Sequence, residues 1–155
     1  MIQAQLHIGT NVDKQGKSFN VIHIKSIVGH PIEQMYREKF EELVNQRLSL
    51  PITTWDTIDQ AEAVYAEQDN EILGFIIFTL AKETNSLWKP LSYVYPEYRN
   101  RGIFKIIHSY LDDIARDMGC TSISSHVHIN NHNQLKIAEK LGLKKVYYLV
   151  GKFVK

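Results

Sequence analysis

Three cations, Arg99, Arg101 and Lys105, surround Gly102 at the start of an amphipathic segment. The first turn of a helix has free N–H groups and a dipole that favours negative charge, so three cations there oppose the dipole unless an anion binds. Gly102 allows the backbone to approach such an anion closely. The pattern fits either a phosphate site or an ordinary basic loop that starts a helix, and the absence of both GxGxxG and GxxxxGK[ST] leaves the two readings open.

Two elements must position these cations. Leu91 to Tyr95 is apolar or aromatic apart from Ser92 and predicts a strand, which Pro96 ends because it has no N–H for the ladder. The following segment has an apolar stripe at helical spacing and stops at Gly119, a residue suited to a left-handed cap. The stripe consists of Ile103, Ile107, Tyr110, Leu111, Ile114 and Met118.

A second candidate group consists of histidines. His126 and His128 fall on one face of a strand predicted for residues 121–129, and His132 lies nearby. Histidine titrates near neutral pH, so either side chain could move a proton, with ordinary surface histidines as the alternative. Their spacing would also suit zinc, but no cysteine or carboxylate stands near them in sequence, and we expect no metal site.

Three blocks of residues together resemble one family. The sequence VYPEYRNRGIFKII is similar to the acyl-CoA-binding motif of the GNAT superfamily of N-acyltransferases, which reads Arg/Gln-x-x-Gly-x-Gly/Ala. Arg99 and Gly102 match its first two fixed positions; Phe104 departs from the third but resembles a recurring RGIF variant. NHNQLKIAEKLGL, residues 131–143, and VYAEQDNEILGFIIF, residues 64–78, resemble two further family segments in the right order.

The resemblance implies an α/β fold with a mixed, mainly antiparallel sheet of about six to seven strands flanked by helices. Two parallel strands would splay apart, the pantetheine arm would enter the gap, and the pyrophosphate would sit on the helix that begins near Arg101. Strand N–H groups near Tyr93 to Tyr95 would polarise the thioester carbonyl. The expected acetyl-CoA contacts are Tyr93, Val94, Tyr95, Arg99, Asn100, Arg101, Gly102, Ile103, Phe104, Lys105 and Asn131.

The family chemistry is direct transfer of an acetyl group from acetyl-CoA to an amine. His128 or His126 is the candidate for proton transfer during that reaction. The tyrosine that often protonates the departing thiolate in this family aligns with Ala138, which leaves the acid unassigned. A GNAT-fold acyl-CoA-binding or protein-interaction module without catalysis is therefore the alternative; Ala138 favours it, whereas the Arg99–Gly102 turn favours the enzyme.

Composition limits the remaining possibilities. The chain has 155 residues, 44% hydrophobic and 23% charged, which indicates a single domain over 1–155. A formal charge of +1 gives no whole-chain attraction for nucleic acid or an anionic membrane, and we expect neither as a partner. One cysteine, no signal peptide and no long apolar run lead us to expect a cytoplasmic protein. The acceptor is an unidentified amine on a small molecule or a protein, and a homodimer is compatible with the sequence.

The remaining elements follow from periodicity and turn residues. A half-buried strand over residues 2–8 and a strand over 19–24 would form a hairpin with a long loop over 9–18. Further along, we expect a helix from Pro31 to about Leu48, irregular chain from 50 to 60, strands over 61–68 and 71–80 joined at Asp69-Asn70, a polar loop over 82–89, a helix capped by Asn131 and ended by Gly142, and a last strand over 146–154.

Overall fold

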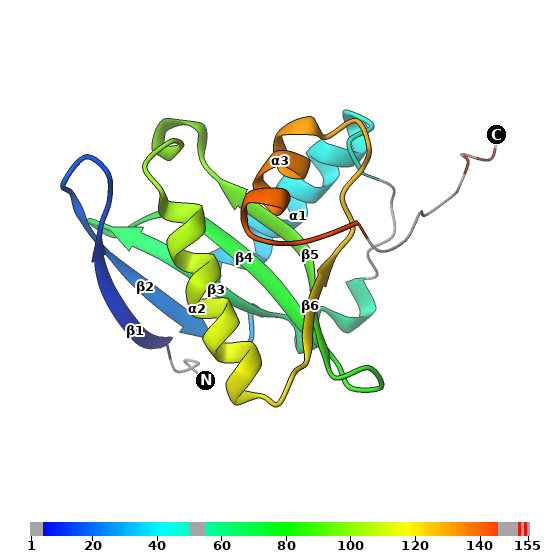
Figure 1. Ribbon diagram of the computed structural model, residues 1–155, viewed down its shortest axis with the longest axis horizontal. Helices are drawn as coiled ribbons and strands as arrows, with labels where there is room; N and C mark the ends of the chain where they lie inside the picture. The colour runs from blue at the N-terminus through cyan, green and yellow to red at the C-terminus, as the bar shows by residue number, and fades with distance from the viewer. Residues whose placement is uncertain (1–4, 50–54, 146–151, 153, 155) are drawn as a thin grey trace.

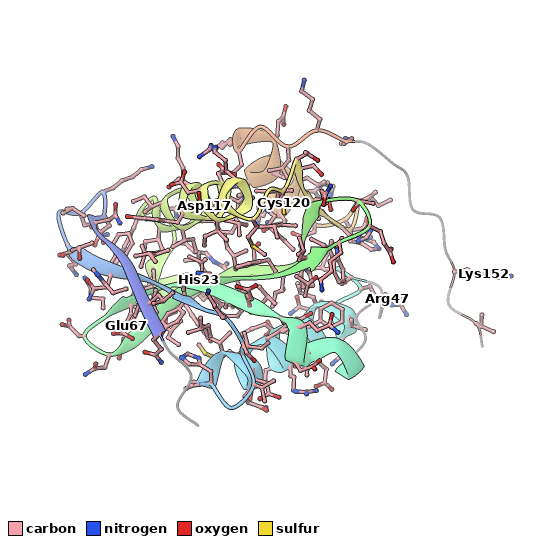
Figure 2. All side chains as sticks on the ribbon, turned by 90° about the horizontal axis from the view of Figure 1, so that it is seen from below. His23, Arg47, Glu67, Asp117, Cys120 and Lys152 are labelled. Atoms are coloured by element: carbon pink, nitrogen blue, oxygen red, sulfur yellow. The ribbon has the colours of Figure 1, made fainter. Side chains whose placement is uncertain are left out.

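The computed structural model describes residues 5–49, 55–145, 152 and 154. These residues form one six-stranded sheet in the order β1-β2-β3-β4-β5-β6. Helices α2 and α3 cover one face of the sheet and α1 covers the other, as Figures 1 and 2 show. The predicted α/β class with a mixed, mainly antiparallel sheet is confirmed, while the strand predicted for residues 146–154 lies outside the described residues.

The first two strands form the predicted antiparallel hairpin, β1 (Gln5–Val12) with β2 (Ser18–Ile24). The expected long loop from Gly9 was wrong, because β1 continues through a register shift between His7 and Gly9 and pairs up to Val12. β1 is an edge strand, so its polar residues can face water and still keep their ladder bonds.

Helix α1 (Pro31–Asn45) and the short 3-10 helix η1 (Trp55–Gln60) follow the hairpin. The His30 ring nitrogen Nδ1 caps α1 by accepting a hydrogen bond from the Ile32 N–H at 3.2 Å. The buried face of α1 packs on the sheet side chains that include Phe75 and Ile77. Residues 55–60 were predicted as irregular chain, and that expectation was wrong.

Strands β3 (Glu62–Gln68) and β4 (Glu71–Ala81) are joined by the predicted tight turn at Asp69-Asn70, where both residues have positive φ. Gly74 in β4 lies opposite Val94 of β5 (Ser86–Val94). A Cβ added to Gly74 would meet the Tyr93 carbonyl oxygen at 2.8 Å, so the β5 backbone approaches this glycine closely.

The start of β5 corrects the sequence analysis, which expected a polar loop up to Lys89. β5 already begins at Ser86 and pairs with β4 on one side and β6 (Ser122–Ser125) on the other. Ser86 and Lys89 are buried polar residues, so the hydrophobic pattern does not reveal this part of the strand. β6 is also shorter than predicted, because its pairing ends at Ser125 instead of Ile129.

Two helices complete the fold on the same face. The 3-10 turn η2 (Pro96–Tyr98) leads into α2 (Ile103–Asp117), and Gly119 follows with a φ of 74° as predicted. Helix α3 (His132–Lys140) begins at the predicted cap, where the Asn131 side chain accepts from the Gln134 N–H at 3.3 Å. Its C-terminal glycine, Gly142, also has the positive φ expected of a helix end.

Candidate active site

The N-terminus of α2 is open to a ligand on the residues that the sequence singles out. Gly102 is its N-cap, with a left-handed φ of 80° and no side chain to satisfy the first N–H groups. The first helical hydrogen bond at this end runs from the Ile106 N–H to the Gly102 carbonyl at 3.2 Å. Ile103 is buried in the core, so only its backbone can face a ligand. The turn therefore offers backbone donors to an anion.

Two of the three predicted cations are exposed here. Lys105 faces water on the first turn of α2. The Arg99 guanidinium donates from Nε to the Val94 carbonyl at 2.9 Å and lies 5.5 Å from the centre of the Tyr93 ring. Between them, Asn100 is exposed and has a φ of 63°. Arg99 thus joins the turn to the end of β5 and keeps further N–H groups for a phosphate.

The third cation, Arg101, faces a buried carboxylate from the tip of the first hairpin. Its Nη1 lies 3.7 Å from Oδ2 of Asp13, and the side chains of these two residues are 13% and 1% exposed. The other Asp13 oxygen accepts from the N–H groups of Gln15 and Lys17. Arg101 therefore neutralises Asp13 and fastens the hairpin to the turn, a role that the sequence analysis did not expect.

Lys14 is a further cation at the turn, and sequence reasoning missed it. Its backbone N–H donates to the Arg101 carbonyl at 3.0 Å. Its aliphatic chain lies over the helix N-cap, since a Cβ built on Gly102 would be 3.3 Å from Lys14 Cε. Lys14 is exposed and stands 88 positions before Gly102, so no local pattern could have placed it there.

The edge of β5 opens next to this turn. β5 and β6 pair in parallel from Ser86 with Ser122 to Lys89 with Ser125, whereas β5 continues to Val94. No strand among the described residues pairs with the β6 side of β5 beyond Lys89. The expected separation of a parallel pair is therefore present, and we call this opening the strand gap.

A β-bulge lies at the closed end of the strand gap. Thr79 pairs with Trp88 and Ile77 pairs with Leu91, so β5 has one extra residue in this interval. Leu87 before the bulge packs in the core under α2, whereas Leu91 after it packs in the core under α1. The bulge thus reverses the two faces of β5 at the point where the gap begins.

Backbone alternation identifies which N–H groups face the strand gap. The Tyr95 N–H donates to the Leu73 carbonyl of β4 at 3.0 Å. Alternation points the N–H of Tyr93 to β4 as well, and those of Ser92 and Val94 to the gap. The Val94 carbonyl, which accepts from Arg99, faces the same way. Of the predicted segment Tyr93 to Tyr95, only Val94 thus directs its backbone into the gap.

A buried cluster that the sequence did not reveal lies beside the bulge. Lys89 and His108 are both 3% exposed, and Nζ of Lys89 lies 3.0 Å from Nε2 of His108. The other ring nitrogen, Nδ1, is 3.7 Å from Oδ1 of Asp112, whose side chain is 54% exposed. Burial lowers the pKa of Lys89 to about 8; burial and the Lys89 charge lower the pKa of His108 to about 4. Burial also raises the pKa of Asp112.

The two histidines predicted to move protons lie beyond the end of β6. Trp88 Nε1 donates to Nδ1 of His126 at 3.2 Å, and the Asn130 N–H donates to Nδ1 of His128 at 3.1 Å. In the neutral state each ring must then carry its proton on Nε2, so neither has a free lone pair. Their assignment as proton acceptors stays a prediction, and it requires these hydrogen bonds to open.

The remaining predicted positions lie on α2 and α3. Phe104 is half-buried, with its ring 6.1 Å from the His108 ring. The side chain of Asn131 is engaged as the cap of α3. Ala138 is half-buried on α3 and supplies no hydroxyl group. Its proximity to a coenzyme sulfur stays a prediction.

An aromatic surface faces α1 on the other side of β5. The rings of Tyr93 and Tyr95 are 5.2 Å apart, and Nζ of Lys39 lies 5.0 Å and 5.7 Å from their centres. Lys39 also bonds Glu42 at 3.0 Å, which raises the pKa of the lysine. This surface attracts cations to the side of β5 that faces away from α2.

Within the described residues, no group of three or more His, Cys, Asp or Glu side chains is arranged to hold a metal ion. No helix in the same part of the chain is long and apolar enough to cross a membrane. Cys120 is a free, half-buried thiol at the end of α2.

An open helix N-terminus beside an open parallel strand pair is the arrangement that the GNAT resemblance implies. A profile of the acetyltransferase (GNAT) family matches residues 29–143. The chain belongs to this family, and the resemblance found in its sequence is confirmed. Members of the family use acetyl-CoA as acyl donor.

Solved structures share this fold. The aminoglycoside N-acetyltransferase AAC(6')-Iy in complex with CoA has a TM-score of 0.59 at 15% identity, covering 79% of this chain and 92% of that chain. An aminoglycoside acetyltransferase from an uncultured soil metagenomic sample has a TM-score of 0.64 at 10% identity, covering 88% and 95%. A ribosomal-protein-alanine N-acetyltransferase from Brucella melitensis has a TM-score of 0.53 at 21% identity, covering 62% of this chain and 72% of that chain. No curated protein sequence matches the chain.

Proposed function

We propose that this protein is an N-acetyltransferase that moves the acetyl group of acetyl-CoA directly to a primary amine. The observation that supports this proposal is that two open binding features lie next to each other in the fold. The open N-terminus of α2 and the open edge of β5 are joined by Arg99, which binds the Val94 carbonyl. One ligand with a phosphate group and an extended arm could occupy both features.

Backbone donors supply the electrophilic part of the proposed reaction. The N–H groups of Ser92 and Val94 face the strand gap and can hydrogen-bond a thioester oxygen as it gains negative charge. The amine must be neutral to attack the carbonyl carbon, so its proton passes to a base. His126 and His128 stay the candidates for that base, subject to the opening of their present hydrogen bonds.

The approach of the acceptor follows from the two faces of β5. Lys14, Lys105 and Arg99 concentrate positive charge at the α2 end, which suits the phosphates. Tyr93 and Tyr95 face α1, where their rings can bind a cationic group. We therefore place the coenzyme on the α2 side and the amine acceptor on the α1 side.

A binding module without catalysis is the second candidate function, favoured by Ala138. Without a hydroxyl at this position, the protein would hold acyl-CoA but release its thiol slowly. A coenzyme thiol is an acceptable leaving group near neutral pH, so this substitution alone does not exclude turnover.

Thiol release in the presence of acetyl-CoA and an acceptor panel separates the two functions. The panel should contain aminoglycosides and peptides with a free N-terminus, because two acetyltransferases of similar fold bear those acceptors in their names. An enzyme releases free thiol in proportion to acetylated acceptor, as mass spectrometry of the product can verify. Binding of acetyl-CoA without release above the acceptor-free rate, across primary amines of every class, would support the module instead.

A further inference from the structure

Lys89 occupies a position where a protein core normally has an apolar side chain. It lies on the same face of β5 as Leu87 and is 3% exposed under α2. No carboxylate in the described part of the chain lies within ion-pair distance of its Nζ, which contacts His108 instead. Burying an ammonium group without such a partner is costly, so its position calls for a functional explanation.

The location of Lys89 connects it to the strand gap. It is the last β5 residue paired with β6, and its carbonyl accepts a hydrogen bond from the Ser125 hydroxyl at 3.1 Å. Its side chain points to α2, where Phe104, His108 and Asp112 follow one another at four-residue spacing on one face. The Lys89 backbone therefore lies at the closed end of the gap, and its ammonium group lies under α2, on the side where we place the coenzyme.

We infer that the Lys89 ammonium group is the acid that protonates the departing coenzyme A thiolate. This inference rests on the proposed acetyltransferase function. The acceptor nitrogen forms a bond to the acetyl carbon, and the C–S bond breaks with its electron pair on sulfur. Sulfur then takes a proton from Lys89 to give the free thiol, while the proton of the acceptor nitrogen leaves to a separate base. Lys89 is left as a neutral amine.

His108 and Asp112 are positioning residues for the Lys89 ammonium group. With Nε2 facing the Lys89 ammonium, neutral His108 carries its proton on Nδ1, which faces the Asp112 carboxylate. Asp112 reaches solvent and also interacts with Asp113 and Arg116 of α2, and the Ser125 hydroxyl of β6 donates to the Lys89 backbone carbonyl. His108 thus accepts a hydrogen bond from the Lys89 ammonium group and fixes its position, while the Asp112 carboxylate favours the tautomer that can accept. The neutral amine takes up a proton from water after the coenzyme leaves.

The chemistry of Lys89 suits the task that Ala138 cannot perform. Burial lowers the pKa of Lys89 to about 8, close to the ordinary thiol value of about 8.5. Proton transfer between groups of similar pKa is nearly balanced, and the ammonium form is available near neutral pH. An ammonium beside the sulfur would also stabilise the thiolate before the proton moves.

The test measures the ionisation of the thiol of coenzyme A itself, which requires no acceptor. Ultraviolet absorbance reports the thiolate fraction of bound coenzyme A as pH is varied. In the parent protein the thiol pKa should fall by about one unit, because a cation lies within reach of the sulfur. A thiol pKa close to that of Lys89 keeps proton transfer between the two groups nearly balanced. Lys89→Met should restore the ordinary value, whereas Lys82→Met, which removes an exposed lysine on the β4–β5 turn, should behave as the parent.

Lys89→Arg separates charge from proton donation and guards against a folding defect in Lys89→Met. Arginine keeps the positive charge but does not release a proton in proteins, so the thiol pKa should stay low while acetyl transfer slows at least tenfold. An ordinary thiol pKa in parent protein that binds coenzyme A would overturn the role of Lys89 and leave the proposed function standing. Absence of coenzyme A binding by the parent would overturn both.

Discussion

Lys89→Met should remove a specific pH dependence from the stability of the folded protein. Burial lowers the pKa of Lys89 from 10.5 to about 8 in the folded state. Between these two pH values the unfolded chain binds more protons than the folded protein. The free energy of unfolding of the parent therefore rises with pH in this window, and the contribution disappears when the side chain cannot titrate.

The size of the effect follows from the two pKa values. Each pKa unit corresponds to about 1.36 kcal/mol, and the folded protein has released the Lys89 proton over most of the interval from about pH 7 to about pH 10. Lys89 alone should thus contribute about 2.5 kcal/mol of added stability across that interval. The side chain is 3% exposed, so solvent screening removes little of this difference.

Urea unfolding at several pH values measures this contribution. The rise in unfolding free energy should be about 2.5 kcal/mol smaller in Lys89→Met than in the parent, while Lys82→Met should match the parent. Loss of the partner of His108 lowers the stability of Lys89→Met by a similar amount at every pH in the window, because His108 is neutral throughout. If the unfolding free energy rises equally with pH in the parent and in Lys89→Met, the conclusion that burial lowers the pKa of Lys89 is refuted.

Three further predictions concern the strand gap. Gly74→Ala should lower the acetyl-transfer rate about tenfold or more, because the new Cβ would lie within 2.8 Å of the Tyr93 carbonyl oxygen and displace the neighbouring Val94 donor. Full activity of this variant, with an unmoved β5 in its crystal structure, would contradict the prediction. Ala138→Tyr should raise the rate wherever thiolate departure limits turnover, and an unchanged single-turnover rate would show that another step limits. His126→Gln and His128→Gln should each be compared with the parent in pH–rate profiles, because the variant that lacks the base loses the limb that this base produces. Superimposable profiles for both variants would exclude the two histidines.

Local signals were sufficient for the elements around Gly102. A glycine with positive φ, a strand-ending proline and a helical apolar stripe lie within one continuous segment, and each acts on its immediate neighbours. The same is true of the turn at Asp69-Asn70 and of the Asn131 cap. The sequence therefore located the turn at Gly102 and the helices correctly.

Contacts between distant segments could not be predicted in this way. Lys89 and Ser86 look like loop residues until β4, β6 and α2 bury them. Arg101 forms an ion pair with Asp13 and is therefore not free to bind a ligand. Asp13 lies on a hairpin that no local sequence pattern connects to α2. The buried side chain of His108 contacts Lys89, which lies 19 positions earlier on β5, so no local pattern connects the two.

Calorimetric titration with acetyl-CoA tests most directly the claim that its pyrophosphate binds at the N-terminus of α2. Arg99→Glu combined with Lys105→Glu reverses two exposed charges at the turn and leaves the Arg101–Asp13 pair intact. The control, Lys25→Glu combined with Lys82→Glu, makes the same change in net charge at exposed positions elsewhere.

We predict that the double variant at the turn binds acetyl-CoA at least about tenfold more weakly than the parent, with the larger loss at low salt, and that the control binds as the parent does. Equal affinities in the parent and the Arg99→Glu, Lys105→Glu variant at low salt would contradict the proposed site.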